Sequence, residues 1–180
     1  MFGLLNSVTV EQRKIDPGFT LIKDAIHPDA PGQLVMAAAM IENLGLRGPL
    51  SSIRVVLDGS SRPRATATGG KVTSVVQSDQ GIEFDWLAEG LPWVLPEEAR
   101  LGGELVHLGH RASREALTVH GLAPGRYELS IDDVIVGVWP QTSLAAHVEL
   151  QGNSKTPQYQ QALRVAELNK QKNEGPVKQL

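Results

Sequence analysis

The sequence contains no cysteine. Disulfide bonds, thiol nucleophiles, and zinc or iron–sulfur sites built on cysteine ligands are therefore excluded. A chain without cysteine is compatible with an oxidising or a reducing compartment, so this absence does not assign a location.

An excess of basic charge and a long hydrophobic run are also absent. The chain has 17 Lys and Arg against 20 Asp and Glu, a formal net charge of −3. A nucleic-acid-binding domain normally carries a basic excess or a basic stripe, and neither is present. The longest unbroken apolar run, residues 34–41, has eight residues, whereas a membrane-spanning helix needs about 20. We therefore expect no nucleic-acid partner and no membrane span.

The N-terminal segment MFGLLNSVTV does not resemble a secretory signal peptide. It has no basic residues before its apolar part, and Asn6 and Ser7 interrupt that part. The localisation stays open, because a signal peptide on preceding sequence would make the protein extracytoplasmic. With 41% apolar and 21% charged residues, the chain has the composition of a globular protein. Its 180 residues fit one domain, or a small domain plus part of another.

The first region, residues 1–50, is helical in pattern. Asp29 is placed to cap a helix with Pro31 in its first turn and Gly45 after its end, which predicts a helix over about 30–44. Because this helix is apolar on nearly every side, it must be buried on most of its surface. Two explanations stay open: the second region wraps the helix, or the elements that cover it are not in this chain.

The second region, residues 51–150, consists of short alternating runs separated by turns. This spacing is typical of an antiparallel β-sandwich-like domain. The predicted strands lie near 53–57, 71–77, 82–87, 116–120, 126–131 and 134–139.

The third region, residues 151–180, contains an amphipathic helix followed by a tail. Thr156 is placed to cap this helix, Pro157 suits its first position, and Gly175 follows its end. We expect the helix to pack on its own domain, and a partner-binding or membrane-surface helix is the alternative.

Asp24 and His27 are the candidate catalytic residues. On a loop, an aspartate three residues before a histidine can accept the proton of one imidazole nitrogen, which leaves the other nitrogen as a general base. Asp24 favours the charged imidazolium, whereas the N-terminus of the following helix disfavours it. The sequence therefore does not show whether the charged or the neutral form of the imidazole is favoured overall.

The segment that begins with this pair, DAIHPDAPGQLVMA (residues 24–37), resembles the last conserved segment of SGNH (GDSL-type) hydrolases. In that family the segment consists of a D-x-x-H-P loop, a small residue, a glycine and an apolar helix. The loop supplies the Asp and His of a Ser-His-Asp triad. The segments GLAPGRY (121–127) and TPQYQQA (156–162) are similar to phrases of a GDSL-like bacterial subgroup with an extra C-terminal β-rich segment.

This resemblance implies an α+β chain in three parts. Residues 1–50 would be the C-terminal end of an SGNH-like α/β hydrolase domain, residues 51–150 the β-rich domain, and residues 151–180 the C-terminal helix and tail. The family's nucleophile lies in an N-terminal Gly-Asp-Ser segment, and a Gly and an Asn from two later segments complete its oxyanion hole. None of the three segments lies among the 23 residues before Asp24. We interpret Asp58-Gly59 as a turn between strands.

The function implied by the resemblance is that of the C-terminal portion of an ester hydrolase. Asp24 and His27 would serve a serine that is not in this chain, and the chain alone would be inactive. The substrate would be a small ester or an acylated carbohydrate, bound when the N-terminal part is present. Two alternatives stay open: a non-catalytic β-sandwich module for binding or interaction, with a glycan as one ligand, and a degenerate, inactive relative of the hydrolases.

The remaining histidines and the tryptophans give weaker patterns. His107 and His110 do not form a regular pair of metal ligands, because Gly109 lies between them and no Asp or Glu lies in that interval. We therefore expect no metal and no cofactor. The three tryptophans could form a sugar-stacking platform, but the strand positions of two of them favour packing in the core.

Overall fold

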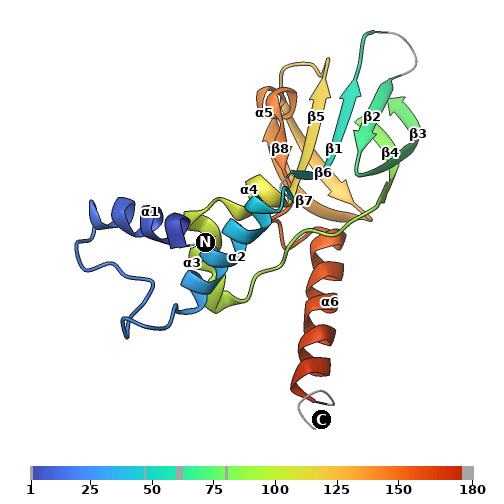
Figure 1. The fold of residues 1–180 in the computed structure, drawn as a ribbon. Coiled ribbons are helices and arrows are strands. Elements are labelled where there is room, and N and C mark those ends of the chain that lie inside the picture. The colour runs from blue at the N-terminus through green and yellow to red at the C-terminus, as the bar shows by residue number, and fades with distance from the viewer. Residues whose placement is uncertain (1, 47, 60–62, 80, 176–180) are drawn as a thin grey trace. The chain divides into compact units, whose positions relative to one another are not determined.

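The structure is a computed structural model that describes residues 2–46, 48–59, 63–79 and 81–175. It is a mixed α+β chain (Figure 1). The elements, in chain order, are α1 (Phe2–Arg13), α2 (Ala30–Asn43), β1 (Pro49–Val56), β2 (Arg64–Thr68), β3 (Gly70–Ser78), β4 (Gly81–Ala88), a 3-10 turn η1 (Glu97–Ala99), α3 (Arg100–Leu105), α4 (Leu108–Ala112), β5 (Arg114–His120), β6 (Arg126–Ile131), β7 (Val134–Pro140), α5 (Gln141–Ala146), β8 (Val148–Glu149) and α6 (Pro157–Glu174).

The chain folds into two compact units, and their limits differ from the expected division at residues 50 and 150. The helical unit comprises residues 1–48 and 95–112, and the β unit comprises residues 49–94 and 113–180. Residues 95–112, which we expected within the β-rich region, thus belong with the N-terminal helices. The sequence predicted only one helical turn in this segment, whereas the structure has η1, α3 and α4 there.

The predicted helix over 30–44 is confirmed as α2, with its predicted cap. The Asp29 side chain accepts a hydrogen bond from the Gly32 N–H, and Pro31 lies in the first turn. Gly45 follows the helix with a φ of 70°, a left-handed conformation that glycine adopts at little cost. Local chemistry alone therefore defines both ends of this helix.

The apolar surface of α2 finds its cover inside the helical unit. Val35 is fully buried, and α1, the loop before α2 and the segment 95–112 supply the residues around it. The buried cluster consists of Leu5, Leu21, Val35, Ala38, Val106 and Leu108. Residues 95–112 of the second region thus cover part of α2, although Met40 remains 49% exposed.

Gly32 allows the start of α2 to lie directly against the preceding loop. A Cβ atom at this position would lie 2.7 Å from the Leu21 carbonyl oxygen and 3.1 Å from the Pro28 Cβ. We expect Gly32→Ala to destabilise the helical unit by about 1–3 kcal/mol, because a backbone atom must move to make room. Gly3→Ala in α1 is the matched control, since a Cβ there meets nothing within 4 Å and should stabilise by up to about 1 kcal/mol.

The measurement is a urea titration followed by far-UV circular dichroism. Equal stabilities of the two variants would show that α2 does not need this close approach.

The β unit contains one four-stranded sheet in the order β2-β1-β5-β8 and two hairpins, β3–β4 and β6–β7. The pairs β1–β2 and β5–β8 are antiparallel, but β1 and β5 are parallel, with Val55 opposite Val119. The expected purely antiparallel arrangement is therefore wrong for the centre of the sheet. The sequence pattern predicts where the strands lie but not which strands pair. The pairing of β1 with β5 is hard to predict because the chain between them contains the whole segment 95–112 of the other unit.

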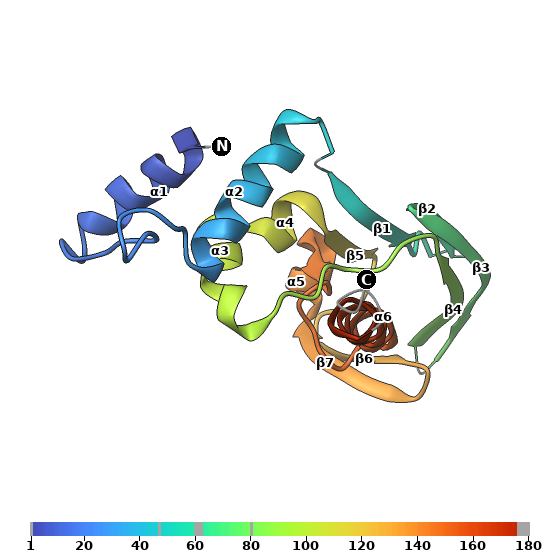
Figure 2. The same ribbon diagram turned by 60° about the horizontal axis from the view of Figure 1, so that its bottom comes forward.

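The core of the β unit lies on one face of this sheet. Its buried residues are Val55, Leu117, Val119, Leu144 and Val148, and side chains of both hairpins pack against them. The view of Figure 2 runs along the axis of α6, and the strands of the β unit lie around that axis. Thr156 caps α6 as predicted, by accepting a hydrogen bond from the Tyr159 N–H.

The helix α6 is anchored mainly through its first turns. Ala162 is its one buried residue, whereas Val165 and Leu168 are 53% and 48% exposed. The expectation that this helix packs along its own domain thus holds only near its start. No helix among the described residues has the length and apolar character that crossing a membrane requires.

Candidate active site

The loop that carries Asp24 and His27 joins α1 to α2 and is fixed at both ends. At its start Leu21 is only 2% exposed within the core of the helical unit. At its end the Asp29 N–H donates a hydrogen bond of 3.0 Å to the Leu21 carbonyl oxygen. The intervening residues therefore form a short surface loop whose two ends are held together.

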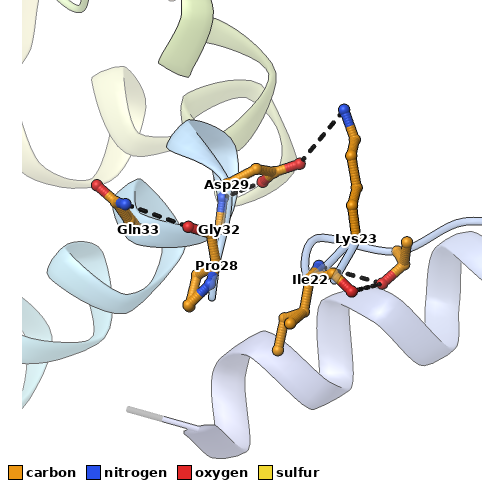
Figure 3. Close-up of polar contacts among 7 residues, drawn as sticks. Ile22, Lys23, Pro28, Asp29, Gly32 and Gln33 are labelled. Carbon is orange, nitrogen blue, oxygen red and sulfur yellow. Dashed lines mark hydrogen bonds and ion pairs between the residues drawn. The ribbon is translucent and has the colours of Figure 1, made fainter. Parts of the chain in front are cut away.

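Further polar contacts secure the point where the loop enters α2 (Figure 3). The Asp29 carboxylate accepts from the Gly32 N–H at 3.0 Å, and the Gln33 side chain donates to the Pro28 carbonyl oxygen at 3.1 Å. Lys23 Nζ lies 3.9 Å from Asp29 Oδ2. Because both groups flank the Asp24–His27 turn, these contacts restrict how far it can move.

The structure brings the two predicted catalytic residues together. Asp24 Oδ2 lies 2.7 Å from His27 Nδ1. The other carboxylate oxygen, Oδ1, accepts hydrogen bonds from the backbone N–H of His27 at 2.7 Å and of Ile26 at 3.0 Å. One oxygen thus fixes the carboxylate to the turn, and the other is free to orient the imidazole ring.

Ala25, between the two, has a φ of 63°. This left-handed conformation is unusual for a residue with a side chain and costs about 1–3 kcal/mol. It turns the chain back so that the Asp24 carboxylate faces the N–H groups of residues 26 and 27. Backbone strain of this kind is concentrated at functional sites, so the observation supports a role for this loop beyond connecting two helices.

The same contacts hold the pKa of the Asp24 carboxyl group below its ordinary range. The hydrogen bond from the His27 backbone N–H is the main cause, followed by those from the His27 ring and the Ile26 N–H, and they lower the pKa from 3.8 to about 2. The carboxylate is therefore ionised at any physiological pH. Any stability from these hydrogen bonds is present above pH 3.8 and is lost as the pH falls towards 2.

Both side chains of the pair are largely exposed to solvent. The His27 side chain is 78% exposed and that of Asp24 is 55% exposed. An open cavity of about 550 Å³ lies in the helical unit beside Lys23 and Asp29, but neither Asp24 nor His27 lines it. In chemical terms the arrangement is an oriented imidazole with an exposed Nε2, as a general base requires.

The other histidines lie outside this loop. His107 precedes α4 with a φ of 50°, and His110 lies within α4. His147 Nε2 lies 3.2 Å from Glu149 Oε1 in the β unit. Among the described residues there is no group of three or more His, Asp or Glu that could hold a metal ion.

Sequence reasoning missed Glu115, a buried acid in β5. It is only 6% exposed, and burial raises the pKa of its carboxyl group from 4.5 to about 7. The alternation of the strand is the sequence signal for this position. Glu115 precedes Leu117 by two residues and Val119 by four, so all three lie on the same face of the strand. The strand predicted from the sequence begins at residue 116, one residue too late to include this acid.

Comparisons with known proteins give one informative match. A scan against protein-family models finds no match, and a search of curated proteins finds no significant one. A search of solved structures finds similarity to a gut microbial diltiazem-metabolizing enzyme, with 32% sequence identity over 94% of this chain and a TM-score of 0.84. The match covers 40% of that enzyme's chain, so the present chain is similar to less than half of the solved protein.

Proposed function

We propose that this chain is the C-terminal portion of an SGNH/GDSL-type ester hydrolase. In this proposal Asp24 and His27 complete a catalytic triad whose serine lies outside the 180 residues. The observation that carries it is the 2.7 Å contact between Asp24 Oδ2 and His27 Nδ1, made by a carboxylate that two backbone N–H groups already hold in place.

The chemistry follows from that contact. Asp24 keeps the proton of His27 on Nδ1, which leaves Nε2 unprotonated and able to accept the proton of a serine hydroxyl. As the serine oxygen attacks the ester carbonyl, the new imidazolium is stabilised by the Asp24 carboxylate. Nε2 then returns the proton to the departing alkoxide. In the second half of the cycle His27 removes a proton from water, which hydrolyses the acyl-enzyme.

The structural comparison supports an enzyme of this general kind. The similar solved protein is described as a diltiazem-metabolizing enzyme, which supports an enzymatic role for the longer protein. The proposed substrates of the present protein, which follow from the resemblance to SGNH hydrolases, are small esters or acylated carbohydrates. A cavity in the β unit, described below, favours a second role for the chain, the binding of a ligand.

The test compares the chain with a longer polypeptide. Residues 1–180 alone should not hydrolyse p-nitrophenyl acetate above the buffer rate, because an oriented base without a serine and oxyanion donors cannot form an acyl-enzyme. The same chain preceded by its own upstream coding sequence should hydrolyse it. Hydrolysis by the isolated chain that His27→Ala abolishes would place a nucleophile among these residues. An inactive longer polypeptide would favour the degenerate relative.

A further inference from the structure

The β unit contains a cavity of about 410 Å³ that the proposed triad does not use. Strands β1, β4, β5 and β6 contribute to its wall, together with Leu150 and Gln158. All of these residues belong to the β unit, so the cavity is a property of that unit alone.

The wall of this cavity is strongly acidic. Five carboxylate residues line it: Glu83, Asp85, Glu115, Glu128 and Asp132. None of the described lining residues is Lys, Arg or His. Glu115 is buried and the other four are exposed, so one acid lies inside and the others surround it. The summed field of these groups attracts cations and repels anions.

Two residues that line this cavity each carry a buried side-chain atom without a hydrogen-bond partner. These atoms are Glu115 Oε2 and Gln158 Oε1, and both are acceptors. Glu115 is only 6% exposed, and its backbone N–H donates to Gln151 Oε1 at 3.1 Å, which fixes its position in β5. Buried polar groups are nearly always hydrogen-bonded in native proteins. These two acceptors are therefore the groups to which a donor that enters the cavity, a water or a ligand, would bind.

Apart from Ser51 and Ser130, the rest of the wall is apolar and partly aromatic. Phe84 and Trp86 of β4, Leu117 of β5 and Leu129 of β6 line the cavity. An aromatic wall beside carboxylates suits a molecule with a positive nitrogen and an apolar body, since the ring faces themselves attract cations. A neutral sugar would also donate hydrogen bonds to these carboxylates, but it carries no positive charge to balance them.

We propose that this cavity binds a small organic ammonium ion with an aromatic or aliphatic body. The ammonium group donates hydrogen bonds to Glu115 Oε2 and Gln158 Oε1, and the apolar body packs against Phe84, Trp86 and Leu129. The bound cation also compensates the buried charge of Glu115, whose isolated burial is costly. This site is independent of the Asp24–His27 pair and of the proposed hydrolase activity.

The test uses the full chain and three ligands of nearly the same shape: tryptamine, the neutral alcohol tryptophol, and the anion indole-3-acetate. Isothermal titration calorimetry at about pH 8, above the raised pKa of Glu115, should show saturable binding of tryptamine. Its affinity should exceed that of tryptophol by about tenfold or more, since a hydrogen bond to a charged group is stronger than a neutral one. Indole-3-acetate should not bind. Phenethylamine serves as a second, smaller amine.

The decisive variant is Glu115→Gln, which keeps the shape of the side chain and removes its charge. It should weaken tryptamine binding by about ten- to one-hundred-fold and leave tryptophol binding nearly unchanged. Glu104→Gln, an exposed acid of the helical unit, is the control and should bind tryptamine as the unchanged chain does.

Three results would overturn the proposal. The first is that neither amine binds saturably, and the second is that tryptophol or indole-3-acetate binds as tightly as tryptamine or more tightly. The third is that Glu115→Gln leaves the affinity for tryptamine unchanged. Folding of the Gln variant is checked by tryptophan fluorescence, because Trp86, Trp93 and Trp139 all belong to the β unit.

Discussion

Replacing His27 by alanine in the longer, serine-bearing polypeptide should lower kcat for p-nitrophenyl acetate by about a thousandfold or more. The imidazole is the group that takes the proton of the attacking serine, and no other described histidine lies on this loop. General base catalysis contributes about 10²–10⁴-fold, and the members of a triad act as a unit. The KM should change much less, because the substitution removes a proton acceptor rather than a binding contact.

The matched control for this variant is His147→Ala. His147 is another exposed histidine beside a carboxylate, with Nε2 3.2 Å from Glu149 Oε1, but it lies in the β unit. Its removal should leave kcat within about twofold of the unchanged polypeptide. Asp24→Asn should reduce kcat by about 10²–10⁴-fold, since its Oδ1 would keep the two backbone hydrogen bonds and its NH2 group would face Nδ1, which moves the ring proton to Nε2. A His27→Ala variant with unchanged kcat would show that this loop is not catalytic.

Glu115→Gln should stabilise the β unit at about pH 8 by up to about 3 kcal/mol, and should change its stability little near pH 4.5. The folded protein holds the proton of Glu115 more tightly than the unfolded chain, because burial raises the pKa from 4.5 to about 7. Between these two values the native state binds more protons, so the stability of the unchanged protein falls as the pH rises. Above about pH 7 the full cost of the buried carboxylate is present, and Gln avoids it.

The measurement is a urea titration at both pH values, followed by tryptophan fluorescence, which reports the β unit because all three tryptophans lie there. Glu128→Gln is the control, since Glu128 lines the same cavity but is exposed, and its effect should stay within about 0.5 kcal/mol. If the stability of the Glu115→Gln variant relative to the unchanged protein is the same at both pH values, or lower at the higher pH, the raised pKa at this residue is contradicted.

The features that the sequence predicted well are those determined by neighbouring residues. Asp29 and Gly45 mark the ends of α2 because a cap and a left-handed turn depend on local chemistry. The contact between Asp24 and His27 is likewise local, since three residues separate the pair and the Asp24 carboxylate itself bonds to the turn.

The features that the sequence did not predict depend on contacts between distant segments. The sequence of the segment 95–112 predicts only one helical turn, and only packing shows that this segment covers α2. The parallel pairing of β1 with β5 joins residues more than sixty positions apart, which alternation within each strand does not specify. The cavity around Glu115 forms from four strands and the start of α6, so no single segment of sequence contains it.

The orientation of the Asp24–His27 pair can be tested most directly by nitrogen-15 NMR of the His27 ring in residues 1–180, well above the ordinary imidazole pKa of about 6.5. If Asp24 orients the ring as proposed, long-range proton–nitrogen spectra will show the proton on Nδ1 and an unprotonated Nε2. Asp24→Ala should abolish this preference, whereas Asp16→Ala, which removes an exposed acid before the loop, should preserve it. A proton on Nε2 in the unchanged chain would leave no free base to accept a proton from serine, and the account of this site would be wrong.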